Sequence, residues 1–251
     1  MVFNAYAAYY DLLYKDKDYN AEAEYIIALI KKHSTNASSI IDFGCGTGKH
    51  AAAFHQNNFS VTGVDLSEKM VAIANENFKA DNLSFASGDI RSIRLHQQYD
   101  VAVSLFHVMS YQTSNDDLLQ SFQTASAHVR KDGLFIFDCW YGPGVVADPP
   151  GQSHKTMHND SIIVNRTATS THNLAGHTVN VHYNVAILQQ ATGTEHTLEE
   201  DHLMRYIFRE EVEQLASQTS FKLRAMHKWL STENLSDEKC WNAVFILQKQ
   251  G

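Results

Sequence analysis

The chain is short of the features that mark secreted and membrane proteins. Its 251 residues contain only three cysteines, an odd number set far apart, so a disulfide framework is not expected. No apolar run approaches the length of a membrane span, and the opening residues, MVFNAYAAYYD, lack the charged and then apolar pattern of a secretion signal. The sequence therefore predicts a cytoplasmic protein in a reducing compartment.

Positive charge is also scarce. The chain has 20 Lys and Arg residues against 28 Asp and Glu residues, a formal net charge of −8, and no basic block interrupts it. Binding to bare phosphate backbones relies on clustered positive charge, so nucleic acid is not the expected partner. One or two local donors can still hold the diphosphate of a small molecule, so a nucleotide-linked ligand stays open.

Short apolar runs alternate with amphipathic segments through the first part of the chain. Such alternation with short turns predicts an α/β fold, in which a parallel sheet carries helices on both faces. Ser67 is the expected N-cap of one of these helices. The expected strands are 39–43, 59–65, 83–89, 100–106 and 134–140, and the expected helices are 21–33, 49–57, 67–78 and 118–129.

The pattern changes after Tyr141. All three prolines lie in residues 142–152, which we predict to be a hinge or boundary loop. Alternation with a period of two then predicts an inserted antiparallel sheet, followed by a helix and two closing strands. The expected strands of the insertion are 161–171, 178–190 and 194–208, followed by a helix at 209–220 and strands at 222–230 and 242–249. The expected domains are 1–141, 142–208 and 209–251.

Glycines at positions 44, 46 and 48 lie between the first expected strand and the helix after it. The missing side chains permit a tight turn, close approach of a ligand to the backbone and close helix packing. This pattern alone is shared by many nucleotide-binding loops and also by glycine-rich turns without a ligand. It predicts a ligand site only together with other residues.

Acidic residues supply that support. Asp65 ends the second expected strand and can accept two hydrogen bonds from vicinal ribose hydroxyls, and Asp89 ends the third. The alternative for both is a role as helix caps or solvated turn residues. A dinucleotide site is disfavoured, because position 49, where that fingerprint has its third glycine, is Lys.

Four segments, IIDFGCGTG, VTGVDLSEKMVAIA, SGDIRS and YDVAVSLFHVMSY, together resemble the motifs of class I S-adenosylmethionine-dependent methyltransferases. The likeness spans residues 40–140 and implies a Rossmann-like sheet that binds S-adenosyl-L-methionine at the carboxyl ends of its strands, with S-adenosyl-L-homocysteine as product. It implies that Asp65 contacts the ribose and Asp89 the adenine amino group. The complete set of expected cofactor-binding residues is Tyr19, Asp42, Gly44, Cys45, Gly46, Gly48, Asp65, Leu66, Met70, Asp89, Ile90, Leu105 and Phe106.

The flanking segments resemble a narrower group, the bacterial N,N-dimethyltransferases of nucleotide-linked amino-deoxysugars. The likeness lies in YYDLLYKDKDYNAEAEYI and VHYNVAILQQATGTEHTLEEDHLMRYIF. It implies a small-molecule acceptor with an amino group, an inserted sheet over the cofactor site, and a homodimer. The histidine that this family is proposed to use in catalysis falls at Tyr111 in this chain, and His107 lies one helical turn earlier.

Three residues are the resulting candidates for orienting or deprotonating the acceptor. They are Tyr111, His107 and Tyr10, the last from a tyrosine-rich segment expected to form a lid; the alternative for each is ordinary packing. A hydroxyl needs a base or a metal whereas an amine needs little more than the loss of a proton, so O-methylation predicts a base near the methyl carbon. A catalytically silent cofactor-binding protein is the other alternative. No metal site is expected, because the histidines lack the spacing of a ligand triad.

Overall fold

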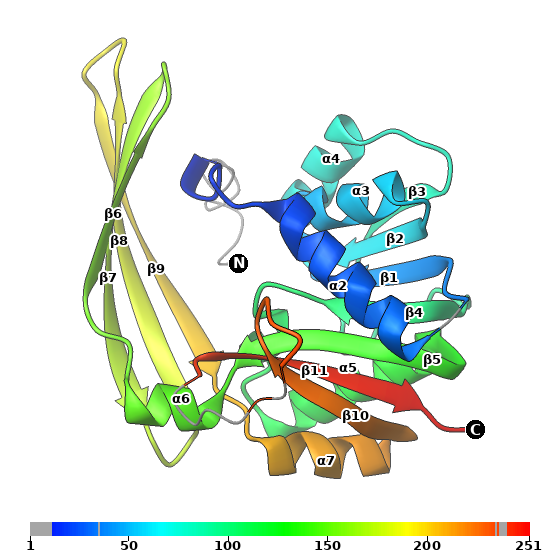
Figure 1. Ribbon diagram of the computed structural model, residues 1–251. Helices are drawn as coiled ribbons and strands as arrows, with labels where there is room; N and C mark the ends of the chain where they lie inside the picture. Colours follow the sequence, from blue (N-terminus) through cyan, green and yellow to red (C-terminus); the bar gives the residue numbers. More distant parts are fainter. Residues whose placement is uncertain (1–11, 35, 234, 236–239) are drawn as a thin grey trace.

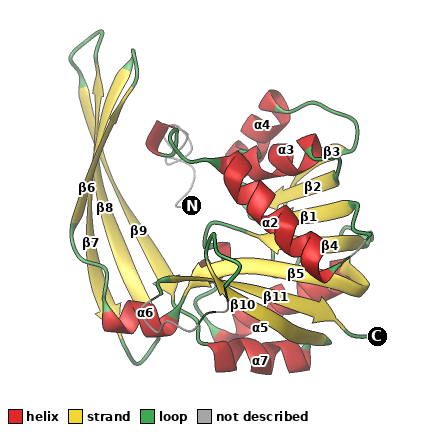
Figure 2. Cartoon of the chain, in the orientation of Figure 1, coloured by secondary structure: helices red, strands yellow, loops and turns green. Residues whose placement is uncertain are grey.

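The computed structural model describes residues 12–34, 36–233, 235 and 240–251 (Figure 1). Tyr10, one of the three predicted catalytic residues, lies outside these ranges. The described chain forms two sheets. One is a seven-stranded sheet with helices on both faces, and the other is a four-stranded sheet that rises beside one end of the first (Figure 2).

The seven-stranded sheet has the strand order β10-β11-β5-β4-β1-β2-β3. Its strands are parallel except β11, which runs antiparallel to both β5 and β10. The predicted parallel sheet with two closing strands is thus confirmed. Its strands are β1 Ser39–Phe43, β2 Ser60–Asp65, β3 Leu83–Ser87, β4 Tyr99–Ser104, β5 Val129–Trp140, β10 Phe221–Lys228 and β11 Asn242–Lys249.

Helices cover both faces of this sheet, which is why its central strands read as continuous apolar runs. In β1, the side chain of Ile40 packs on the face covered by α2 and α3, and that of Ile41 packs on the face covered by α5 and α7. Both isoleucines are fully buried, and each burial stabilises the fold by about 1.5–3 kcal/mol. The helices are α2 Tyr19–His33, α3 Lys49–Gln56, α4 Glu68–Asn77, α5 Asn115–His128 and α7 Arg209–Gln218, and a 3-10 turn, η1, spans Val108–Tyr111.

The four-stranded sheet, here named the lid sheet, is antiparallel with the order β6-β7-β8-β9. The alternation predicts only three strands in this segment, so β6 corrects the prediction. SHKTMH was missed because Met157 is its one apolar residue, and the backbone pairing with β7 makes it a strand. The lid sheet comprises β6 Ser153–His158, β7 Ile162–Asn173, β8 Thr178–Gln189 and β9 Glu195–Arg205.

The link between the two sheets is a second correction. Residues 142–152 were predicted to be a loop, but Gly142–Ala147 form a short helix, α6. Pro143 lies in the first turn of α6, where a missing N–H costs nothing and the fixed φ favours the helix. A proline counted as a helix breaker therefore opens a helix.

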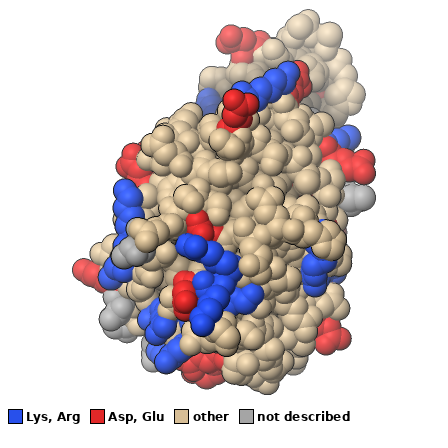
Figure 3. Space-filling view, turned by 90° about the vertical axis from the view of Figure 1, so that its right-hand side faces the viewer, with Lys and Arg blue, Asp and Glu red and all other residues tan. Residues whose placement is uncertain are grey.

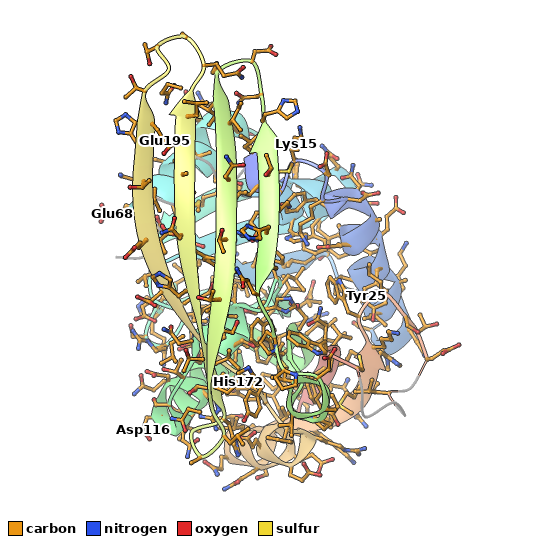
Figure 4. All side chains as sticks on the ribbon, turned by 90° about the vertical axis from the view of Figure 1, so that its left-hand side faces the viewer. Lys15, Tyr25, Glu68, Asp116, His172 and Glu195 are labelled. Carbon is orange, nitrogen blue, oxygen red and sulfur yellow. The ribbon has the colours of Figure 1, made fainter. Side chains whose placement is uncertain are left out.

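The lid sheet turns one face toward the core. Leu13, from the segment before α2, is fully buried and packs with Met70 of α4 and Val164 of the lid sheet. The opposite face carries exposed polar residues such as Asn184 and Glu199. Figure 4 looks onto that outer face, with Glu195 near its tip and His172 near the base that adjoins the core. The inner face thus encloses space between the lid sheet and the core.

The remaining features concern membrane-spanning helices and the charged side chains on the surface. Within the described ranges, no helix combines the length and the apolar character needed to cross a membrane. On the side of the core away from the lid sheet, Lys and Arg side chains gather next to Asp and Glu side chains (Figure 3). The lid sheet stands on the opposite side of the molecule (Figure 1).

Candidate active site

The glycine loop connects β1 to α3, and its backbone conformation explains the glycines. Gly44, Gly46 and Gly48 have φ values of +79°, +55° and +84°, a left-handed region that other residues enter at a cost. A Cβ at Gly44 would also lie 2.4 Å from the Val108 side chain, so η1 approaches the loop too closely for any other residue. At Gly46 a Cβ would meet no described atom within 4 Å. The loop therefore leaves open space in front of Gly46.

Asp65, at the end of β2, holds this loop in place. One carboxylate oxygen accepts a hydrogen bond from the Gly46 N–H at 2.9 Å, and the other accepts one from the Ser67 N–H at 2.8 Å. Ser67 caps α4, as predicted, by accepting from the Met70 N–H. Burial raises the pKa of Asp65, and the two backbone hydrogen bonds partly offset the rise. The carboxylate is thus oriented before any ligand arrives.

Asp42, at the carboxyl end of β1, lies behind the loop. Its side chain is 1% exposed, and its Oδ2 has no hydrogen-bond partner in the part of the chain that the structure describes. Burial, reinforced by the nearby Asp65 carboxylate, raises the pKa of Asp42 to about 7. Burial therefore favours the protonated form of the Asp42 carboxyl much more than in an exposed aspartate.

Asp89 lies two residues beyond β3, not at the end of the strand as predicted, because β3 ends at Ser87. The Arg91 guanidinium binds it through both carboxylate oxygens, with Nε at 2.9 and 3.0 Å, and reaches Asp117 of α5 at 2.8 Å. This bidentate pairing lowers the pKa of Asp89. Arg91 was missed as a functional residue, although it stands inside the motif SGDIRS.

Most of these residues line a cavity of about 550 Å³ between the carboxyl edge of the large sheet and the inner face of the lid sheet. We name it the active-site cavity. Its volume lies in the range of small-molecule sites. The predicted residues that line it are Tyr19, Gly44, Cys45, Gly46, Asp65, Leu66, Met70, Asp89, Ile90, Leu105, Phe106, His107 and Tyr111. Asp42 and Gly48 are not among the lining residues.

The cavity wall also contains residues that sequence reasoning did not assign to a site. His50, on α3, lies 2.7 Å from the Glu22 carboxylate of α2. Tyr14, expected only as part of a lid, packs edge-on against Phe106 with ring centroids 5.0 Å apart. The alternation in β8 and β9 indicates which residues share a face of the lid sheet. It does not indicate which face turns toward the core. The unassigned lining residues are Tyr14, His50, Arg91, Val108, Gln112, Trp140, Val181, Tyr183, His202 and Met204.

His107 is held at the cavity by Asp138 of β5. The His107 Nδ1 lies 2.7 Å from the Asp138 Oδ2, and the His107 backbone N–H donates to both Asp138 oxygens at 3.2 Å. His107 and Phe106 both have positive φ, a rare conformation for consecutive residues that are not glycine. Asp138 is 1% exposed and supplies the interaction that keeps this turn in place.

The residues that build the cavity also match known proteins. Residues 40–133 match the methyltransferase domain family. A dTDP-3-amino-3,4,6-trideoxy-alpha-D-glucopyranose N,N-dimethyltransferase from Streptomyces venezuelae is 30% identical over 183 residues, which are 72% of this chain and 76% of that protein. The chain belongs to the class I S-adenosylmethionine-dependent methyltransferases.

Two further similarities cover more of this methyltransferase. A dTDP-3-amino-3,6-dideoxy-alpha-D-glucopyranose N,N-dimethyltransferase from Streptomyces fradiae is 29% identical over 209 residues, 82% of this chain and 80% of that protein. The structure of CalS10, an amino pentose methyltransferase from Micromonospora echinaspora with S-adenosylmethionine bound, superposes with a TM-score of 0.78 at 19% identity. That superposition covers 100% of this chain and 98% of CalS10, and it shows that the two share a fold.

The cavity of this methyltransferase fits its cofactor, S-adenosylmethionine. The open space at Gly46 admits a ligand against the backbone, and the oriented Asp65 carboxylate at its edge is suited to a ribose. Leu66 is 48% exposed and lines the cavity, so it offers an apolar surface to a ligand. Asp65, Asp89 and the apolar residues between them are the groups that would hold the adenosine part.

Replacement of Asp65 by alanine should weaken binding of S-adenosylmethionine by about 1.5–3 kcal/mol, because hydrogen bonds to a charged acceptor are lost. The loop would also lose the anchors at Gly46 and Ser67. Isothermal titration with S-adenosylmethionine and S-adenosylhomocysteine measures the change. Asp81→Ala, which removes an exposed acid before β3, is the matched control. Unchanged affinity in Asp65→Ala would show that this carboxylate does not contact the cofactor.

Proposed function

We propose that this methyltransferase transfers methyl groups to the amino group of a nucleotide-linked deoxysugar. The observation that carries the proposal is the 209-residue similarity to an N,N-dimethyltransferase of a dTDP-aminosugar. The match is longer than residues 1–141 and 209–251 together. It therefore extends into residues 142–208, the segment that forms the lid sheet. The similarity therefore includes the acceptor side of the cavity as well as the cofactor side.

The walls of the cavity suit such an acceptor. Bound S-adenosylmethionine supplies an electrophilic methyl group, and the protein must align the acceptor nitrogen with it and exclude water. Aromatic side chains from three parts of the chain, Tyr14, Trp140 and Tyr183, close the acceptor side. They offer flat apolar surfaces for a sugar ring and a base.

Positive charge on the inner face of the lid sheet supports a diphosphate group on the acceptor. Lys155 of β6 and Arg166 of β7 are register partners. The Arg166 guanidinium lies 4.5 Å above the Tyr183 ring, and its Nη1 donates to the Tyr14 hydroxyl at 3.4 Å. Lys155 and Arg166 lie against the cavity-lining Tyr14 and Tyr183, so they bring positive charge close to the cavity although the whole chain is acidic.

The remaining assignments belong to the same proposal. Residues 1–141 would serve as an N-terminal lid and cofactor-binding core, 142–208 as the inserted sheet for the acceptor pocket and dimerisation, and 209–251 as the helix and closing strands that complete the core. Tyr111 and His107 are the candidate catalytic residues described below, and Tyr10 remains a prediction from the sequence. We further propose that the enzyme acts in the cytoplasm as a homodimer on a small molecule, without nucleic acid or membrane as partner.

The proposal is tested with matched acceptors. The enzyme is incubated with S-adenosylmethionine and either a dTDP-linked amino-deoxysugar or the same nucleotide sugar with a hydroxyl in place of the amine. Formation of S-adenosylhomocysteine is measured for each. We expect formation with the amine alone. Formation with the hydroxyl compound alone would overturn the proposal, and formation with neither would support a silent cofactor-binding protein.

O-methylation is a second candidate, because His107 lines the cavity and its Nδ1 lies 2.7 Å from the Asp138 carboxylate. A hydroxyl acceptor must lose its proton during attack, and a positioned histidine contributes about 10²- to 10⁴-fold to such reactions. His107→Gln should then reduce O-methylation by about 100-fold or more. Under the amine proposal, the same variant should retain N-methylation within about fivefold, since an amine has little need of a strong base. Initial rates with both acceptors separate the two functions.

A further inference from the structure

Three side chains form a continuous chain from the active-site cavity into the lid sheet. The Tyr111 hydroxyl, at the end of η1, lies 2.8 Å from Nδ1 of His202 on β9. The Nε2 of His202 lies 3.4 Å from a carboxylate oxygen of Glu200, two residues earlier on the same strand. Tyr111 and His202 line the cavity, and His202 and Glu200 are both buried. The core thus supplies the hydroxyl, and the lid sheet supplies the imidazole and the carboxylate.

The surroundings keep Tyr111 in its neutral form. Burial raises the pKa of Tyr111 well above its ordinary value, nearby Tyr183, Tyr14 and Glu200 raise it further, and Arg166 offsets part of the rise. A neutral tyrosine hydroxyl can donate one hydrogen bond and accept others at the same time. Tyr111 can therefore donate to His202 while it accepts from a group inside the cavity, but it is a poor base by itself.

The orientation of His202 follows from its two neighbours. A hydroxyl donating to Nδ1 requires that nitrogen to be an acceptor, so the ring proton lies on Nε2, on the side of Glu200. The groups that face His202 are Glu200 on its own strand, Tyr183 on β8 with its ring centroid 4.8 Å away, and Tyr111 on η1. Arg166 on β7 and Tyr14 before α2 lie beside this group. A carboxylate at Nε2 stabilises the imidazolium that forms when Nδ1 takes a proton.

We propose that Tyr111, His202 and Glu200 form a proton relay that removes the proton from the acceptor nitrogen of the substrate. The inference rests on the proposed amine acceptor. Tyr111 is the catalytic residue, because it lines the cavity and its hydroxyl contacts His202, and His202 and Glu200 act through it as positioning residues. The Tyr111 hydroxyl therefore lies between the substrate and the imidazole of His202.

The proton step balances within these residues. An N–H bond of the substrate ammonium breaks and its electron pair stays on nitrogen, while the proton bonds to the Tyr111 oxygen. The original Tyr111 proton passes to Nδ1 of His202, which becomes an imidazolium paired with Glu200. The proton leaves to solvent after the product departs. The same cycle serves a second methylation, since the first product is again an ammonium that must lose a proton.

The relay also depends on the lid sheet being in place. Tyr111 belongs to the core and His202 to β9, so the hydrogen bond between them exists only where β9 packs against η1. The relay is therefore complete only where the lid sheet packs on the core.

The test compares three variants, each of which removes one chemical group of the relay with little change in side-chain size. Tyr111→Phe removes the hydroxyl, His202→Asn keeps an acceptor for Tyr111 but cannot take a proton, and Glu200→Gln removes the charge. In Tyr111→Phe and His202→Asn we expect kcat for N-methylation to fall by about 100-fold, with KM and cofactor affinity unchanged. Glu200→Gln should move the acid limb of the kcat pH profile to lower pH, because the imidazolium loses its carboxylate partner.

Two control variants separate the relay from general damage. Tyr25→Phe removes a hydroxyl that binds the Ser231 carbonyl, and His182→Asn removes the histidine that pairs with Asp201 on the outer face of the lid sheet. Neither should change kcat or its pH profile. Where His202→Asn fails to fold, Glu200→Gln and Tyr111→Phe still decide the question.

The outcomes distinguish this inference from the proposed function. N-methylation with unchanged kcat in Tyr111→Phe and an unchanged acid limb in Glu200→Gln would overturn the relay and leave the amine acceptor standing. A native enzyme that methylates only hydroxyl acceptors would overturn both proposals.

Discussion

Gly46→Leu should eliminate measurable binding of S-adenosylmethionine, a loss of more than about 100-fold, or about 3 kcal/mol. The reason is geometric. A Cβ at position 46 would meet no described atom within 4 Å, and the space in front of it is the active-site cavity that the cofactor must enter. The leucine side chain would fill that space without displacing any neighbour. Isothermal titration with S-adenosylmethionine measures the effect.

The backbone strain of that substitution has a matched control. Gly193, in the turn between β8 and β9, also has a positive φ of +69° and open space at its Cβ, but it lies at the outer end of the lid sheet. Gly193→Leu should carry a similar conformational cost of about 1–2 kcal/mol and leave cofactor affinity unchanged. Native affinity in Gly46→Leu would show that the cofactor does not occupy the space beside the glycine loop.

Asp42 should make the unliganded protein less stable as the pH rises from about 4 to about 8. Its pKa in the folded protein is about 7, above the ordinary value of 3.8, so the folded state binds more protons across this window. Stability falls with pH wherever the folded state holds the extra proton. A difference of this size corresponds to about 4 kcal/mol at most, because one pKa unit is worth about 1.4 kcal/mol.

Asp42→Asn isolates this effect, because an asparagine side chain does not titrate between about pH 4 and about pH 8. Denaturant unfolding of both proteins across the pH range gives the difference in the free energy of unfolding. We expect Asp42→Asn to become progressively more stable relative to the native protein as the pH rises. A constant difference would mean that Asp42 titrates normally, and that its burial behind the loop does not penalise the charge.

The cofactor half of the molecule follows from local sequence because its constraints are local. The strand β1 is buried on both faces and reads as an apolar run, and the left-handed backbone at Gly44 and Gly46 needs glycine. A short strand, a tight turn and the helix after it are adjacent in the chain. Residues 39–56 therefore specify the glycine loop and the strand and helix on either side of it.

The acceptor half could not be read in the same way, because long-range packing decides it. Strand β6 has little apolar character and exists through its pairing with β7. The alternation in β9 groups His202 with Glu200, yet only the packing of the lid sheet on η1 places His202 beside Tyr111. For the same reason His107 could be named from the sequence, while its partner Asp138 could not.

Transfer of isotopically labelled methyl groups tests the proposed reaction most directly. The enzyme is supplied with S-adenosylmethionine carrying a deuterated methyl group and with a panel of dTDP-linked amino-deoxysugars, and tandem mass spectrometry locates the label in the product. We expect two labelled methyl groups on the sugar nitrogen and none on oxygen. Label found only on a hydroxyl oxygen, or no transfer to any amine in the panel, would contradict the proposed function.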